Sequence, residues 1–167
     1  SMLVSDDFPA ADSPYGARPT RDDVVALFGP LKEKADRNQH EDGRLFVYAA
    51  GHGTADLYAS QRSVLLTANT SRHLSMHVLL PAYADFFRRA WTFDEVILLM
   101  DCCRNPDPRT RIGGAEELSG APKHARADQV KYFSAFGTCW PHVARERDMT
   151  GTCRGIFTTA FLEALET

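Results

Sequence analysis

Three short apolar runs divide the chain, and each is bordered by polar or glycine-containing sequence. They lie at residues 45–50, 96–100 and 130–135. A short, nearly continuous apolar run is typical of a strand that is buried on both faces of a parallel sheet. We therefore predict three strands at these positions.

Outside the three predicted strands, apolar residues recur at helical spacing. Behind the loop-like residues 8–20, Thr20 is a suitable N-cap, because its side-chain oxygen accepts from the free amides of a first helical turn. Apolar side chains then recur at helical spacing over residues 24–31. Pro30 is expected to kink or shorten this helix.

Two further helices complete the pattern. One is predicted over residues 73–90, with a start near Pro81, and the other over residues 157–165. Strands that alternate with helices predict an α/β fold, with a mainly parallel sheet and helices on both faces. Residues 104–129 form a long connection rich in proline, glycine and charge, and a connection of this length is usually functional or disordered.

Composition narrows the class of protein. The 167 residues fit one domain with its own core, and the net charge of −3 argues against nucleic acid as the main partner. The sequence has no apolar run long enough to span a membrane and does not open with a signal peptide. The four cysteines have no spacing typical of a disulfide framework, so we expect reduced thiols and a cytoplasmic location.

A histidine and a cysteine follow directly after the first two predicted strands. His52 lies between two glycines after the run 45–50, and Cys103 belongs to the sequence Asp-Cys-Cys-Arg (101–104) after the run 96–100. The carboxyl ends of parallel strands form the edge where open α/β sheets bind ligands. We therefore expect both side chains at that edge.

This pair suits nucleophilic catalysis. A free thiol with a pKa near 8.5 is mostly protonated at neutral pH, and an adjacent imidazole takes its proton and later protonates the leaving amine. The amides of Gly53 and Cys103 are candidates for an oxyanion hole. The alternatives are a structural turn at His52 and a cysteine that only packs. Cys102 is a rival nucleophile, but side chains alternate along a strand, so only one of the two cysteines meets His52.

Three segments resemble the caspase-like cysteine peptidases. Residues 48–53 resemble the strand and Gly-His-Gly turn of that family, and residues 100–104 resemble the metacaspase pattern Asp-(Ser/Cys)-Cys-His. Residues 155–162 resemble the segment that closes the bacterial domains. The 51 positions between His52 and Cys103 match the spacing of about 50 residues in caspases.

The resemblance covers about residues 18–165 and implies a caspase-like three-layer sandwich with Cys103 as nucleophile and His52 as base. Two departures stand out. Residues 104–106 are Arg-Asn-Pro where metacaspases carry His-Ser-Gly, and the first strand and helix of the family are missing. Residues 1–7 would be the second strand or its remnant, and the 167 residues would be one domain of a longer protein.

The resemblance also implies a function. Metacaspases use an acid two residues before the nucleophile to bind a basic P1 side chain, so Asp101 is the candidate substrate-binding residue. The implied activity is an endopeptidase that cuts protein or peptide substrates after Arg or Lys. The alternative roles are a structural Asp101 that caps local amides and a catalytically inactive domain that serves as a scaffold in a signalling protein.

Family resemblance further suggests activation by cleavage within the connection 104–129. The basic residues there are the candidate self-cleavage sites: Arg109, Arg111, Lys123 and Arg126. Calcium activation is known in the family, but no ligand spacing here indicates a calcium site, and we expect no other cofactor or metal.

The remaining polar and thiol groups are expected to be structural. The histidines at positions 73 and 77 read as a helix-surface pair, the acids at 22–23 and 94–95 as surface charges, and Cys139 and Cys153 as packing residues.

Overall fold

The computed structural model describes residues 2–71, 75–108, 110, 112–113, 118, 123–149 and 152–166. At its centre lies a three-stranded parallel sheet in the order β1-β5-β6, made of β1 (Glu41–Gly51), β5 (Phe93–Cys102) and β6 (Lys131–Phe136). Each strand contains one of the three apolar runs. The prediction of an α/β fold with a parallel sheet is confirmed.

The register between β1 and β5 changes once. Glu41 pairs with Phe93, an offset of 52 positions, whereas Gly51 pairs with Cys102, an offset of 51. The change falls between Glu41 and Arg44, so β1 carries one extra residue there.

A glycine and a carboxylate support this bulge. Gly43 has a φ of 119°, a region that residues with a side chain rarely adopt. Its amide donates to the Asp94 carboxylate at 2.8 Å. Asp94 therefore satisfies the backbone of the bulge from the neighbouring strand.

Helix α1 (Arg21–Asp36) begins as predicted at Thr20, which forms a capping box with Asp23. The helix continues through Pro30 to Asp36. The expected shortening of the helix at Pro30 is therefore wrong. Packing explains its persistence, because Phe28 contacts Tyr83 of the next helix with ring centroids 4.5 Å apart.

Helix α2 (Leu80–Arg89) has Pro81 in its first turn, so the predicted start near Pro81 is confirmed. His77 precedes this helix and lies in the short strand β4 (His77–Val78). A helix face shared by His73 and His77 is therefore wrong for His77, because His77 pairs with Leu66 of β3 (Ser63–Leu66) and α2 begins only at Leu80. His73 lies outside the described residues.

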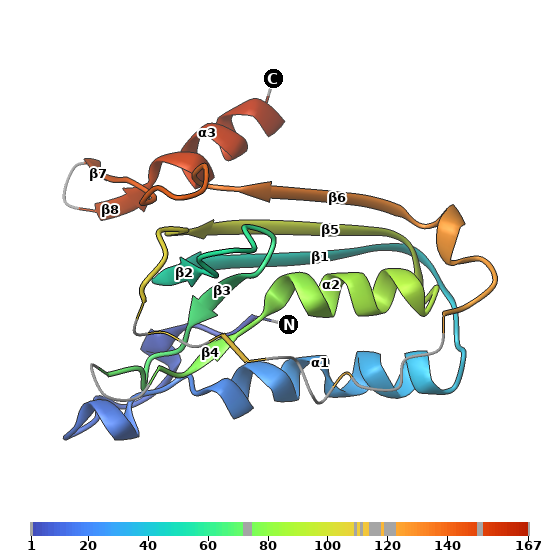
Figure 1. The fold of residues 1–167 in the computed structure, drawn as a ribbon, viewed down its shortest axis with the longest axis horizontal. Helices are drawn as coiled ribbons and strands as arrows, with labels where there is room; N and C mark the ends of the chain where they lie inside the picture. The colour runs from blue at the N-terminus through green and yellow to red at the C-terminus, as the bar shows by residue number, and fades with distance from the viewer. Residues whose placement is uncertain are drawn as a thin grey trace.

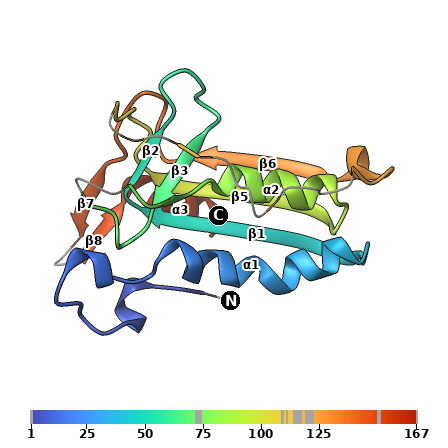
Figure 2. The same cartoon turned by 60° about the horizontal axis from the view of Figure 1, so that its bottom comes forward.

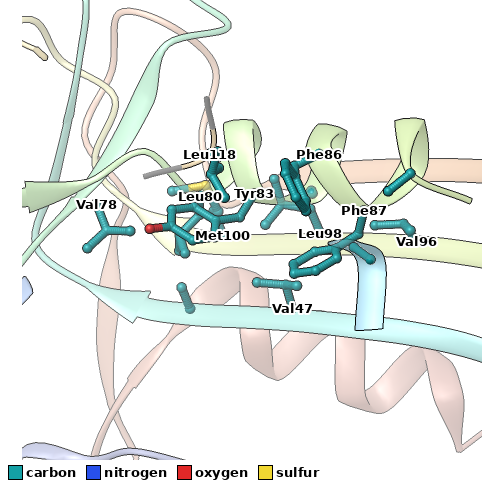
Figure 3. Close-up of a cluster of buried hydrophobic side chains, with 14 of the residues drawn as sticks. Val47, Val78, Leu80, Tyr83, Phe86, Phe87, Val96, Leu98, Met100 and Leu118 are labelled. Carbon is teal, nitrogen blue, oxygen red and sulfur yellow. The ribbon is translucent and has the colours of Figure 1, made fainter. Parts of the chain in front are cut away.

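Helices α1 and α2 cover the same face of the sheet (Figures 1 and 2). The core fills the space between α2 and the strands β1 and β5 (Figure 3). Its largest fully buried side chains come from α2 and β5, namely Tyr83, Phe86, Phe87, Leu98 and Met100. Because strand side chains alternate, every second residue of β5 from Val96 to Cys102 enters this core.

The opposite face of the sheet is covered only in part. Helix α3 (Ile156–Leu165) lies on this side (Figure 1), and the Tyr48 hydroxyl is 2.8 Å from the Thr158 hydroxyl. Helices thus occupy both faces, as predicted. Phe46 and Phe133, however, remain 54% exposed on the strands that flank β5.

Short elements surround the carboxyl ends of the parallel strands. Antiparallel β2 (Gly53–Ala55), β3 (Ser63–Leu66) and β4 form one small sheet, and β7 (Glu146–Met149) pairs with β8 (Thr152–Gly155). The 3-10 helices are η1 (Ser5–Asp7), η2 (Pro14–Gly16) and η4 (Ala127–Gln129). Residues 2–7 contain η1 and no strand, so their assignment as a strand remnant is wrong.

The described parts of the connection 104–129 are attached to the domain. Pro106 bridges to Ala55 of β2, Leu118 is buried in the core, and the His124 amide donates to the Arg89 carbonyl. The expectation of an exposed connection is wrong for these positions. Over the residues described, each helix is too short or too polar to cross a membrane.

Candidate active site

The histidine and the cysteine predicted to react occupy neighbouring strand ends. Gly51 and Cys102 are the last register partners of β1 and β5, and His52 and Cys103 follow them directly. Paired backbones in a sheet lie about 4.8 Å apart, so the chain delivers His52 and Cys103 to adjacent positions. His52 is exposed and Cys103 is half-buried. Both residues are open to a substrate from solvent.

Gly53 packs directly against the backbone that carries the nucleophile. A Cβ atom at this position would lie 2.7 Å from the Cys102 sulfur and 2.7 Å from the Cys103 carbonyl oxygen. Only glycine fits so close a contact. This close contact gives a physical reason for the second glycine of the Gly-His-Gly sequence. The spacing of residues along the chain does not provide that reason.

The Gly53 amide points away from the strand with which it pairs. The Leu66 amide donates to the His52 carbonyl at 2.9 Å, which makes those two residues a hydrogen-bonded antiparallel pair. Hydrogen-bonded and non-hydrogen-bonded pairs alternate, so the next pair, Gly53 and Leu65, leaves the Gly53 amide outside the ladder. An amide outside this ladder is a candidate donor to an oxyanion, and the role expected of Gly53 stays a prediction.

Cys102 is a core residue, which confirms the sequence-based interpretation. Its side chain is fully buried among the apolar side chains of β5 and α2. Burial raises the pKa of the Cys102 thiol to about 12. Cys102 is therefore protonated at neutral pH and unsuited to attack, which leaves Cys103 as the candidate nucleophile of the pair.

Asp101 lies beneath helix α3. Its carboxylate is 7% exposed and accepts from the Thr158 amide at 3.2 Å and from the Thr158 hydroxyl at 2.6 Å. A Cβ atom on Gly137 or Gly155 would come within 2.5 Å of a carboxylate oxygen. Asp101 therefore occupies a close-fitting cradle and caps the first turn of α3, the structural role considered for it above.

Arg104 joins the two loops on either side of Cys103. The guanidinium donates to the Ser63 hydroxyl at 2.9 Å and the Ser60 carbonyl at 2.7 Å on one side, and to the Thr138 carbonyl at 3.3 Å on the other. It also lies 4.1 Å from the Phe136 ring centroid. The residue that departs from the metacaspase pattern thus fixes the walls of the site.

No family model and no curated protein matches this chain. The chemistry of the site therefore rests on its own geometry. A base and a thiol at adjacent strand ends, a free glycine amide and rigid loop walls suit acyl transfer to a thiolate.

The four candidate self-cleavage residues differ in what the structure shows of them. Lys123 is exposed and lies 3.6 Å from Asp128, and Arg126 is exposed with its guanidinium 4.9 Å from the Trp91 ring centroid. Arg109 and Arg111 lie outside the described residues. Cys139 is exposed rather than packed, and the Cys153 side chain lies outside the described part.

Sequence reasoning missed a polar cluster at the other end of the strands. His40, Asp42 and Asp94 place one ligand atom each within 4.8 Å of the others. Asp94 had been interpreted as an ordinary surface charge. The signal was available in principle, because these residues border the amino ends of two predicted neighbouring strands, but their mutual distance depends on the bulge in β1.

Proposed function

We propose that the chain is a cysteine endopeptidase of the caspase-like type, with Cys103 as nucleophile and His52 as general base. The observation that carries this proposal is the register of β1 and β5, which ends on Gly51 and Cys102 and so sets the next two residues side by side. The parallel sheet with helices on both faces is compatible with the three-layer architecture that the sequence resemblance implies.

The proposed reaction begins with transfer of the Cys103 proton to His52. The thiolate attacks the scissile carbonyl, and the amides of Gly53 and Cys103 stabilise the oxyanion. The imidazolium then protonates the leaving amine, and water hydrolyses the thioester. Burial of Cys102 supports this assignment because it leaves one ionisable thiol at the end of β5.

Specificity for Arg or Lys at P1 is the finer part of the proposal. Asp101 supplies a carboxylate two residues before the proposed nucleophile. Among the described residues, its hydrogen-bond donors are the amide and hydroxyl of Thr158, which are both uncharged. A basic P1 side chain is the complementary ligand for such a group.

Hydrolysis of fluorogenic peptides tests the activity. Purified chain is incubated with peptides that carry Arg, Lys or Asp at P1, and with a thiol-reactive peptide inhibitor whose attachment is located by mass spectrometry. We expect hydrolysis after Arg and Lys and labelling of Cys103.

Cys103→Ala is the matched control, because it removes only the sulfur. It should abolish hydrolysis and labelling. Equal hydrolysis by this variant would identify a contaminating protease. A folded wild-type chain that neither hydrolyses nor reacts would instead support the inactive scaffold. Preferred cleavage after Asp would retain the peptidase and overturn the basic specificity.

A further inference from the structure

A second cluster of potential ligands lies at the amino ends of the parallel strands. His40 immediately precedes β1, Asp42 lies in the β1 bulge, and Asp94 is the second residue of β5. An eleven-residue strand separates this cluster from His52, a path of roughly 35 Å at the usual rise per residue. The cluster is therefore separate from the proposed active site.

The ring of His40 is fixed in one orientation. Its Nδ1 lies 2.9 Å from the Trp91 carbonyl oxygen, an acceptor, so Nδ1 carries the proton and donates it. The ring also stacks on Trp91 with centroids 3.9 Å apart and planes 9° apart. A histidine whose other ring nitrogen donates to a backbone carbonyl has the arrangement found in metal ligands.

The remaining nitrogen of His40 faces two carboxylates. Nε2 lies 3.2 Å from Asp94 Oδ1 and 3.4 Å from Asp42 Oδ1. Because Nε2 lies within hydrogen-bond distance of Asp94 Oδ1, a protonated Nε2 donates to this carboxylate. An unprotonated Nε2 instead presents a lone pair beside the two carboxylate oxygens, and a cation bound among the three atoms takes the place of that proton.

Nearby basic side chains are engaged elsewhere. Among the described residues, Arg44 and Lys131 both form salt bridges with Glu95, and Arg126 lies over the Trp91 ring. Neither Asp42 nor Asp94 has a lysine or arginine salt bridge among the described pairs, although a cleft of about 700 Å³ contains these basic groups as well.

The two separations from Nε2 are compatible with a small tetrahedral ion. Bonds of about 2.0–2.1 Å to nitrogen and oxygen, as zinc forms, set neighbouring ligand atoms about 3.3 Å apart at the corners of a tetrahedron. The two measured separations from Nε2 are 3.2 and 3.4 Å. An ion of octahedral preference with similar bond lengths would require ligand atoms closer together.

We propose that His40, Asp42 and Asp94 bind a divalent transition-metal ion of the zinc type. One imidazole and two carboxylates supply three ligands, and the cleft leaves the fourth position open to water. Such an ion joins the segment that follows α1 to the start of β5 and holds the bulge at Gly43 from both sides. Its role is a structural cross-link, independent of the proposed peptidase activity.

Tryptophan fluorescence provides a local readout. The chain has two tryptophans, and Trp140→Phe leaves Trp91, which stacks on His40, as the only emitter. Titration with Ni²⁺ or Co²⁺, which quench a nearby indole, avoids signals from metal bound to the distant thiols. We expect saturable quenching with one ion per chain.

Asp42→Asn is the decisive variant, because the Asp42 side chain is 99% exposed and its replacement leaves the fold intact. It should weaken binding at least about tenfold. Asp128→Asn, another exposed carboxylate, should bind as the wild type does, and His40→Gln should lose saturable quenching. Quenching without saturation up to about 1 mM, or equal affinity in Asp42→Asn and wild type, would overturn the proposal and leave a protonated His40 as the positive charge.

Discussion

The Asp101 carboxylate accepts hydrogen bonds from both the backbone amide and the hydroxyl of Thr158, in the first turn of α3. The end of β5 and the start of α3 are thereby tied together two residues before the proposed nucleophile. Any role of Asp101 in binding substrate is combined with this structural one, and substitutions can separate the two.

Asp101→Ala is expected to lower the free energy of unfolding by about 1–3 kcal/mol, because it leaves the half-buried Thr158 amide without its acceptor. If Asp101 also binds P1 arginine, kcat/KM of the variant for P1 Arg peptides falls as well. This fall corresponds to a loss of about 2–5 kcal/mol of transition-state stabilisation. Thr158→Val is the control, since it removes the hydrogen bonds of the Thr158 hydroxyl with Asp101 and Tyr48 and keeps the carboxylate. Loss of stability in both variants, with P1 preference unchanged in both, would limit Asp101 to its capping role.

The buried thiol of Cys102 predicts a loss of stability in alkali. Its folded pKa of about 12 lies above the ordinary value of 9.0, so folding favours the protonated thiol. The stabilisation from the protonated Cys102 thiol is complete below pH 9 and is lost as the pH rises from 9 towards 12. Over that range the free energy of unfolding falls by at most about 1.4 kcal/mol per pH unit.

Cys102→Ala should remove this pH dependence and leave that of the other titrating groups unchanged. Urea unfolding at several alkaline pH values measures the free energy of unfolding of both proteins. The same variant should retain most peptidase activity and the labelling of Cys103. Identical pH profiles for variant and wild type would show that the Cys102 thiol does not titrate as its burial requires.

Arg104 is expected to act as a positioning residue. Arg104→Met keeps the length of the side chain but removes the three hydrogen bonds to the loops around Ser60 and Thr138. We expect it to cost about 2–3 kcal/mol of stability and to lower kcat more than it raises KM, because the loops no longer hold the site in one geometry. Arg37→Met, at an exposed helix pair with Glu33, should cost less than about 1 kcal/mol. A stable Arg104→Met protein with full kcat would contradict the positioning role.

Self-processing, which rests on the proposed activity, should occur within the connection 104–129. Intact-mass measurement on incubated protein should find cuts after basic residues there, with Lys123 available because its side chain is exposed. Basic residues within α1 should resist, since a peptidase of this kind binds extended chain. The same fragments from Cys103→Ala at the same rate would attribute them to another protease.

The sequence predicted the elements that carry strong periodic or continuous apolar patterns. The strands that end at Gly51 and Cys102 and the helix that starts at Leu80 are of this kind. Strands of two to four residues, such as β4, have too few positions for a pattern and form because neighbouring chain supplies their hydrogen bonds.

The candidate site likewise has features that the sequence predicts and contacts that it does not predict. Placement of His52 and Cys103 at one edge follows from parallel strands of similar length, so sequence sufficed. The partner of Asp101 lies 57 positions along the chain on another element, and no local pattern predicts that contact. The grouping of His40 with Asp94 likewise depends on tertiary geometry.

The bulge in β1 determines which residue stands beside His52. With Glu41 paired to Phe93, an unbroken ladder would set His52 against Arg104, and every later side chain of β1 would turn to the other face of the sheet. One surplus residue beside Gly43 moves the frame back onto Cys103. Alignment of the proposed base with the proposed nucleophile thus depends on the far end of the strand. A one-residue insertion or deletion near Gly43 would shift every later pair of β1 and β5, as a frameshift alters every later codon.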